Sequence, residues 1–135
     1  METVKKVITI PSNLKKVFEE YLYLTKPLHG LRPLEIRVIA VFLYYNVLEM
    51  ENFKREEDRW VKLFSYETKL KIRNDLKIKD HTLQNLLSSL RKKGVIVDNK
   101  IAPYYVPQVQ TKTKSFQLIY NFNIKDEQEE QGKGT

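Results

Sequence analysis

The sequence of 135 residues contains no cysteine, only two histidines and only four glycines. Without cysteine the chain can form no disulfide bond, no cysteine-ligated zinc site and no iron–sulfur cluster, and it has no thiol nucleophile. Two histidines are too few for a histidine-rich metal site. Glycine-rich phosphate loops, paired-histidine metal motifs and Gly-x-Ser-x-Gly motifs are all missing. We therefore expect no metal, no cofactor and no enzymatic activity.

Long apolar runs are missing as well. No apolar run approaches the roughly 20 residues that span a bilayer, and residues 1–9 alternate charged and β-branched side chains where a signal peptide would be apolar. The sequence thus predicts a cytoplasmic protein with no membrane partner. Its richness in Lys, Ile, Asn and Tyr is typical of an AT-rich genome, which favours a bacterial cell or a phage as the source.

What the sequence has in excess is positive charge, and this charge is concentrated in one stretch. The chain carries 24 basic and 17 acidic side chains, a net charge of +7. Residues 65–114 alone carry 11 basic and 4 acidic side chains, so the whole excess falls within them. A basic surface suits acidic partners, of which nucleic acid comes first and anionic lipid second.

The first 30 residues predict a strand followed by a helix. The β-prone run Val4–Ile10 is ended by Pro11, and Ser12 is the expected N-cap of the helix. Apolar residues then recur at helical spacing, namely Leu14, Val17, Phe18, Tyr21 and Leu22. Residues 25–33 contain two prolines and one glycine and predict a loop, in which His29 is expected to be solvated.

Residues 33–46 predict a helix that is buried on nearly every side. Pro33 suits its first turn, and its few polar positions are Glu35, Arg37 and Asn46. Such a helix is typical of the centre of a small domain. The charged stretch 49–60 predicts a solvated helix or an ordered connection, which Trp60 and Phe64 dock onto the core.

Two further helices are predicted with a tight connection between them. Ser65 is the expected N-cap of a helix that ends near Leu76, and residues 77–79 form the connection. Asp80 is then expected to cap a longer helix whose apolar residues are Leu83, Leu86, Leu87 and Leu90. Basic residues occupy its last turn, and Gly94 follows as a natural C′ residue.

After Gly94 the sequence becomes rich in β-formers. Residues 95–97 predict a strand, and Asp98-Asn99 predict a turn. Two prolines make residues 101–110 an edge strand or a loop. Residues 115–124 alternate apolar and polar side chains and give the clearest strand signal in the chain. Residues 125–135 are polar and acidic and predict a disordered tail.

A short helix, a three-residue turn, a second helix ending in Arg-Lys-Lys-Gly and a β-hairpin together resemble the winged helix-turn-helix superfamily. The resemblance is carried by Leu31-Arg-Pro-Leu-Glu-Ile-Arg-Val-Ile-Ala, Thr68-Lys-Leu-Lys-Ile-Arg-Asn-Asp-Leu and Lys79-Asp-His-Thr-Leu-Gln-Asn-Leu-Leu-Ser-Ser-Leu-Arg-Lys-Lys-Gly-Val-Ile. It implies an α+β, mainly helical fold with an N-terminal strand-helix extension (1–30), a winged helix-turn-helix domain (31–124) and an acidic tail (125–135). Two departures are the long connection 48–64 and the long, proline-bearing wing 98–114.

On this resemblance, we expect helix 80–93 to enter the major groove while a basic wing lies on the DNA backbone. With the leucines turned toward the core, the opposite face of this helix is polar and basic. The predicted base contacts are His81, Gln84, Asn85, Ser88 and Ser89. The predicted phosphate contacts are Lys69, Lys71, Arg73, Lys77, Lys79, Lys92, Lys100, Lys112 and Lys114.

Two functions stay open at this point. The first is a protein that binds double-stranded DNA, a transcriptional regulator or a replication initiator, which acts as a homodimer. The second is a winged-helix interaction module in a larger assembly, such as a phage virion or a polymerase complex, with little sequence-specific DNA binding. The candidate partner surface is formed by Phe53, Trp60, Tyr104 and Tyr105. RNA binding has no signature beyond charge, because the usual aromatic sheet motif is missing.

Overall fold

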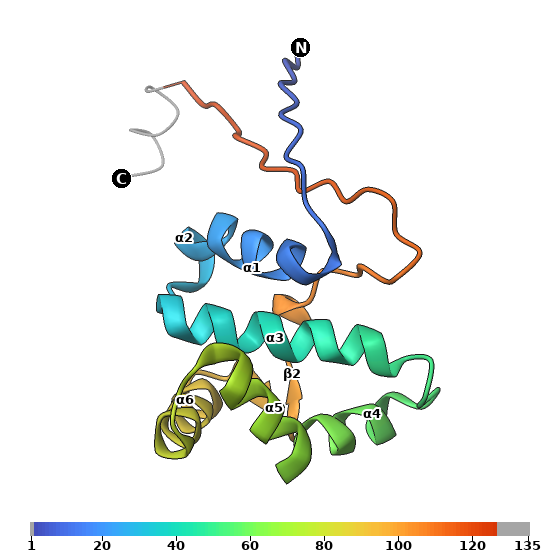
Figure 1. The fold of residues 1–135 in the computed structure, drawn as a ribbon. Helices are drawn as coiled ribbons and strands as arrows, with labels where there is room; N and C mark the ends of the chain where they lie inside the picture. Colours follow the sequence, from blue (N-terminus) through green and yellow to red (C-terminus); the bar gives the residue numbers. More distant parts are fainter. Residues whose placement is uncertain (1, 127–135) are drawn as a thin grey trace.

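The computed structural model describes residues 2–126, which fold into six helices followed by one short antiparallel hairpin (Figure 1). The helices are α1 (Leu14–Leu24), α2 (Lys26–His29), α3 (Pro33–Glu49), α4 (Glu56–Leu63), α5 (Tyr66–Leu76) and α6 (Asp80–Lys92). The hairpin is β1 (Ile96–Val97) with β2 (Lys100–Ile101), and a 3-10 turn, η1 (Pro103–Tyr105), comes next. The mainly helical class is confirmed. No helix within residues 2–126 combines the length and the apolar character needed to cross a membrane.

Helix α3 forms the centre of the fold. It packs against α1 on one side and against α4, α5 and α6 on the other (Figure 1). A helix with apolar residues on all sides must be covered by other helices on both sides, because its apolar side chains are more stable out of water. Its fully buried residues include Ile36, Ile39, Phe42 and Leu43. The prediction of a buried central helix that begins at Pro33 is confirmed.

Helix α1 belongs to the same hydrophobic core as the rest of the molecule. Phe18 and Leu22 are at most 1% exposed and lie in the cluster that α3 organises. The N-cap is Asn13, whose Oδ1 accepts a hydrogen bond from the backbone N–H of Lys16 at 3.0 Å. The prediction that Ser12 caps this helix is therefore wrong by one residue, because Ser12 donates its hydroxyl hydrogen bond to Glu20 instead.

Residues 25–33 are not a simple loop, since they contain the short helix α2. His29 is half-buried at its end, and its Nδ1 accepts a hydrogen bond from the backbone N–H of Leu31 at 3.0 Å. Its Nε2 therefore carries the hydrogen and donates to the carbonyl of Leu22 at 2.8 Å. The prediction of a solvated histidine is wrong, because this ring joins α1 to the start of α3.

The long connection between α3 and α5 is ordered and contains α4. Arg59 on α4 donates from Nε to the side-chain oxygen of buried Asn46 on α3, at 3.1 Å. Trp60 is 6% exposed, and the ring of Phe64 stacks on that of Phe42 with 4.9 Å between the centroids. The prediction that Trp60 and Phe64 dock this connection onto the core is confirmed.

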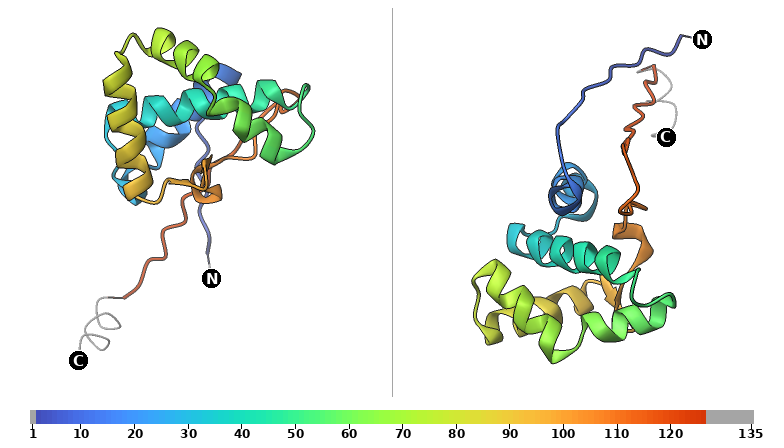
Figure 2. Two further views of the ribbon diagram at one scale, coloured as in Figure 1. Left: turned by 90° about the horizontal axis from the view of Figure 1, so that it is seen from below. Right: turned by 45° about the vertical axis from the view of Figure 1, so that its right-hand side comes forward.

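The two strands predicted near the ends of the chain are not formed. Residues 2–12, called the N-terminal arm, and residues 115–126, called the C-terminal arm, carry no strand pairing. Both arms project from the α1 side of the molecule and lie apart from the helices (Figures 1 and 2). A period-2 pattern gives a strand only where a neighbouring strand accepts its backbone hydrogen bonds. Within residues 2–126 the one pair of strands is β1 with β2. The predicted tail beyond residue 126 lies outside the described residues.

Candidate nucleic-acid interface

Helices α5 and α6 are joined by a turn of three residues, as the sequence predicts. Ser65 caps α5, because its Oγ accepts a hydrogen bond from the backbone N–H of Thr68 at 3.3 Å. The chain reverses at Lys77, whose φ of +56° lies in the left-handed region that commonly ends a helix. Ile78 in this turn packs against the hydrophobic core.

The start of α6 differs by one position from the prediction. Lys79 is the N-cap, and Asp80 is the first residue of the helix without a capping hydrogen bond from its side chain. The carboxylate of Asp80 lies 3.6 Å from Nη1 of Arg73 on α5. A carboxylate in the first turn is still favoured by the helix dipole. The prediction that Asp80 caps the helix is wrong, whereas the helix itself is confirmed.

Helix α6 has one buried face and one open face. Its four predicted core residues are at most 7% exposed, namely Leu83, Leu86, Leu87 and Leu90. Four of the predicted base-contact residues are exposed on the other side, namely His81, Gln84, Asn85 and Ser88. No acidic residue occurs on α6 after Asp80. The left view of Figure 2 shows α6 at the edge of the molecule.

Ser89, the fifth predicted base contact, is turned toward the interior. Its Oγ donates a hydrogen bond to Oε2 of Glu35 on α3 at 3.0 Å. Lys93, which follows α6, donates from Nζ to Oε1 of the same carboxylate at 2.7 Å. The backbone N–H of Arg32 donates to Oε1 at 2.9 Å. The Glu35 side chain is fully buried, so these donors take the place of water.

The charge of Glu35 is held by its neighbours. Burial alone would raise the pKa of this carboxyl, but the hydrogen bonds from Lys93, Arg32 and Ser89 lower the pKa to about 2. Glu35 therefore stays ionised and fastens the end of α6 to the first turn of α3. Sequence reasoning treated Glu35 only as a polar position on an apolar helix. The signal that marks it is its place three residues after Arg32, which is the spacing of a capping box.

The predicted phosphate contacts near α6 fall into two groups. Four of them are exposed on the turn before α6, in its last turn and on the hairpin, namely Lys77, Lys79, Lys92 and Lys100. The α5 cations are engaged with neighbours. Lys69 lies 5.9 Å above the ring of Phe64, Lys71 lies 4.0 Å from the carboxylate of Glu67, and Arg73 pairs with Asp80.

The hairpin after α6 is shorter than the predicted wing. Its strands pair Ile96 with Ile101, and β1 contacts α6. The turn predicted at Asp98-Asn99 is confirmed, because both residues have positive φ, +52° and +55°. Two successive positive φ values are typical of the type I′ turn that closes two-residue hairpins.

The predicted wing does not extend to residue 114. Pairing stops at Ile101, because Pro103 and Pro107 lack the N–H that a ladder needs. The chain then crosses to the α1 side of α3, where the loop after η1 (orange in Figures 1 and 2) lies away from α6. Lys112 and Lys114 belong to this loop and are exposed there. The prediction that these two lysines lie on a wing beside α6 is therefore wrong.

The four residues of the predicted partner surface do not share an exposed face. Trp60 is buried, and its Nε1 donates to a carboxylate oxygen of Glu56 at 3.3 Å. Phe53 is half-buried before α4, and Tyr105 is half-buried in η1. Tyr104 is 64% exposed. The partner-surface prediction is thus wrong for Trp60, because its ring is needed to close the core.

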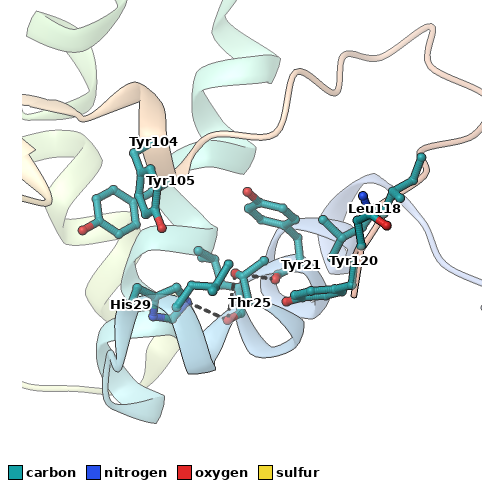
Figure 3. Close-up of a pocket in the computed structure, with 11 residues that line it drawn as sticks. Tyr21, Thr25, His29, Tyr104, Tyr105, Leu118 and Tyr120 are labelled. Atoms are coloured by element: carbon teal, nitrogen blue, oxygen red, sulfur yellow. Dashed lines mark hydrogen bonds between the residues drawn. The ribbon is translucent and has the colours of Figure 1, made fainter. Parts of the chain in front are cut away.

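Tyr104 and Tyr105 border a small pocket of about 210 Å³ between η1, α1 and the C-terminal arm (Figure 3). Leu118 and Tyr120 of the arm form its other wall. The Thr25 hydroxyl in the pocket donates to a backbone carbonyl of α1 at 2.9 Å. Because its threonine and histidine side chains already form hydrogen bonds with the backbone, we assign no ligand to this pocket.

Comparisons with protein-family models, curated proteins and solved structures found no match to this chain. Within residues 2–126 no three acidic or histidine side chains gather where they could hold a metal ion. A functional assignment therefore rests on the geometry of α6 and its surroundings.

Proposed function

We propose that the protein binds double-stranded DNA by placing α6 in the major groove, as winged helix-turn-helix proteins do, with the hairpin β1–β2 beside it. The observation that carries this proposal is the open face of α6. Its exposed side chains are polar or basic, and none is acidic after Asp80. A helix face that serves only for solvation commonly mixes glutamate with lysine. The absence of carboxylates from this face suits an anionic partner.

The dimensions and chemistry of this face match a DNA groove. The 13 residues of α6 give a helix about 20 Å long, and a major groove about 12 Å wide admits a helix. Asn85 and Gln84 can bond the edge of adenine bidentately. Lys79 and Lys92, at the two ends of α6, are in position to neutralise phosphates on either side. In this proposal the protein is a transcriptional regulator or a replication initiator.

The buried Glu35 supports the same proposal. Base readout requires a helix that is held rigidly. If the helix is loosely held, the entropy cost of ordering it on binding reduces the affinity. The carboxylate of Glu35 accepts hydrogen bonds from Ser89 and Lys93 at the end of α6. Along the rest of the helix, four leucines pack into the hydrophobic core. The open face of α6 is thus held in a fixed position in the protein without DNA.

A second candidate function is a winged-helix interaction module in a larger assembly, such as a phage virion or a polymerase complex. The observation that favours it is apolar surface away from α6, on Tyr104 and on the two arms. This function predicts a stable complex with a different protein and weak binding to duplex DNA.

The test is binding to random duplex DNA, single-stranded DNA and RNA at two salt concentrations, followed by selection from a random duplex library. We expect duplex to bind most tightly, and the selection to give one motif. Asn85→Ala should relax the preference within that motif, because Asn85 reads bases. Asn52→Ala, an exposed asparagine between α3 and α4, is the matched control and should leave the motif unchanged. The absence of any duplex preference would contradict the proposal.

A further inference from the structure

Apolar side chains are exposed mainly on the two arms. Of the eighteen large apolar residues that are exposed within residues 2–126, ten lie on the arms. On the N-terminal arm these are Val4, Val7, Ile8 and Ile10, which are 54–84% exposed. On the C-terminal arm they are Phe116, Leu118, Ile119, Tyr120, Phe122 and Ile124. Exposed apolar side chains gathered on two extended segments point to a surface that another chain covers.

The area of this surface is that of a dimer interface. A large apolar side chain offers roughly 100–200 Å² when fully exposed, and the ten are exposed by about two thirds on average. Each chain therefore presents on the order of 1,000 Å² of apolar surface on its arms. The largest apolar patch on a typical monomer is roughly 300–600 Å². A standard interface buries about 800 Å² on each partner.

The C-terminal arm has a fixed half and a free half. The ring of Phe116 packs edge-on against Tyr21 of α1, with 5.8 Å between the centroids, and the Tyr120 hydroxyl donates to the carbonyl of Leu24 (Figure 3 shows Tyr21 and Tyr120). Beyond this anchor the exposed fractions rise, to 83% at Phe122 and 95% at Ile124. The free half therefore leaves the helices with its apolar side chains and its backbone uncovered.

We propose that the N-terminal arm of one chain pairs as an antiparallel strand with the C-terminal arm of a second copy, and that two such pairings form a two-fold dimer. Both arms have the β-prone composition of strands, and within residues 2–126 neither arm pairs with a neighbouring strand. An unpaired extended segment is a template for strand addition. A two-fold axis makes the two pairings equivalent, so every arm in the dimer has a partner.

Direction and charge favour this arrangement. The N-terminal arm runs toward the helices and the C-terminal arm runs away from them (Figures 1 and 2). A two-fold axis along the arms keeps these directions, so the N-terminal arm lies antiparallel to the partner's C-terminal arm. In the register that sets the exposed Lys6 opposite Asp126, Ile8 lies opposite Ile124, and Lys125 falls on the other face of the pair, opposite Val7. Opposite charges across neighbouring strands stabilise the pair.

The first test is the molar mass of the full-length protein by light scattering during size exclusion. We expect twice the chain mass of 16.1 kDa. Ile8→Lys and Phe122→Lys, each in the full chain, should give the monomer mass with an unchanged helical circular dichroism signal, because both side chains are exposed in the monomer. The matched control is Val61→Lys on α4, where a 74% exposed valine lies outside the arms. It should leave the dimer intact.

The second test uses the absence of cysteine, because introduced cysteines then have no competitors. A double variant, Ile8→Cys with Ile124→Cys, places the two thiols opposite each other in this register, so it should form disulfides between two chains on mild oxidation and migrate as a covalent dimer without reductant. Val61→Cys alone should stay monomeric on the gel.

Three results would overturn the proposal. They are a monomeric native protein at micromolar concentration, a dimer that survives both lysine substitutions, and an Ile8→Cys, Ile124→Cys disulfide formed within one chain. None of them depends on DNA, so the dimer can fail while the α6 proposal stands, and the reverse also holds.

Discussion

At the scale of single residues, Glu35 is the side chain on which the position of α6 depends most. It is a buried carboxylate whose charge is balanced by Lys93, by a backbone N–H and by the Ser89 hydroxyl. A buried charge is tolerated only when it is paired and hydrogen-bonded. The four leucines of α6 determine which face of the helix packs into the core. The hydrogen bonds of Glu35 fix the position of its C-terminal end.

Replacing this carboxylate tests that role. Glu35→Gln should lower the free energy of unfolding by about 2 kcal/mol at pH 7, because Lys93 loses its ionic partner. The pKa of Glu35 is lowered from 4.5 to about 2, so its contribution is complete above pH 4.5 and is lost as the pH falls toward 2. Urea denaturation at several pH values measures both effects.

Two outcomes would contradict this role. One is equal stability of the native and Glu35→Gln proteins at pH 7, and the other is a difference that persists undiminished at pH 2. Glu51→Gln, at an exposed position after α3, serves as the control and should leave the stability unchanged at every pH.

The sequence predicted most of this residue-scale picture but not its exceptions. Leucine spacing gave the buried face of α6, and by subtraction the open face with His81, Gln84, Asn85 and Ser88. Ser89 lies at the border between the two faces, and its direction is decided by a carboxylate 54 positions earlier in the chain. No pattern within the helix contains that information.

At the scale of elements, helices were predicted well and the terminal strands were not. A helix satisfies its hydrogen bonds within its own segment, so the spacing of apolar residues in α1, α3, α5 and α6 was enough to find it. A strand needs a neighbour from elsewhere in the chain. The alternating pattern of residues 115–124 is genuine, since it turns Phe116, Leu118 and Tyr120 toward α1, with exposures of 36–45%, and leaves Ile119 71% exposed. It has no neighbouring strand within residues 2–126.

The hairpin turn offers a prediction at this scale. Asn99 has a φ of +55°, which costs a residue with a side chain more than it costs glycine. Asn99→Gly should therefore raise the free energy of unfolding by about 0.5 kcal/mol, measured by urea denaturation. Asn74→Gly, at an exposed helical position of α5, is the control and should lower it by about 0.3 kcal/mol. Equal effects at the two sites would show that the turn geometry is not what matters.

At the scale of the whole molecule, α6 and the arms lie on opposite sides of α3 (Figure 1). Charge counting in the sequence located the excess of basic residues in residues 65–114, and this stretch holds α5, α6 and the hairpin. It also included Lys112 and Lys114, which the fold carries to the α1 side. Sequence proximity could not reveal this, because the path of the chain after Ile101 depends on packing against α1.

The separation of α6 from the arms allows the dimer and DNA binding to be tested together. A two-fold axis along the arms would leave both α6 helices at the same end of the dimer. Ile8→Lys should then bind a duplex that carries one selected motif as the native protein does. It should lose the extra affinity that the native dimer gains on a duplex with two properly spaced motifs. Titrations of one-site and two-site duplexes measure the difference. An equal loss on both duplexes would instead place the arm in the DNA interface itself.

The proposed DNA-binding surface consists of α6 and its neighbouring lysines. The salt dependence of duplex binding, measured for the native protein, Lys92→Ala and Lys112→Ala, decides whether this surface contacts the DNA. Both lysines are exposed, but Lys92 lies in the last turn of α6 and Lys112 lies across α3. We predict that log K falls linearly with log salt, that Lys92→Ala reduces the slope by about one, and that Lys112→Ala leaves it unchanged. A native protein without any salt slope, or the same loss from both substitutions, would contradict the account.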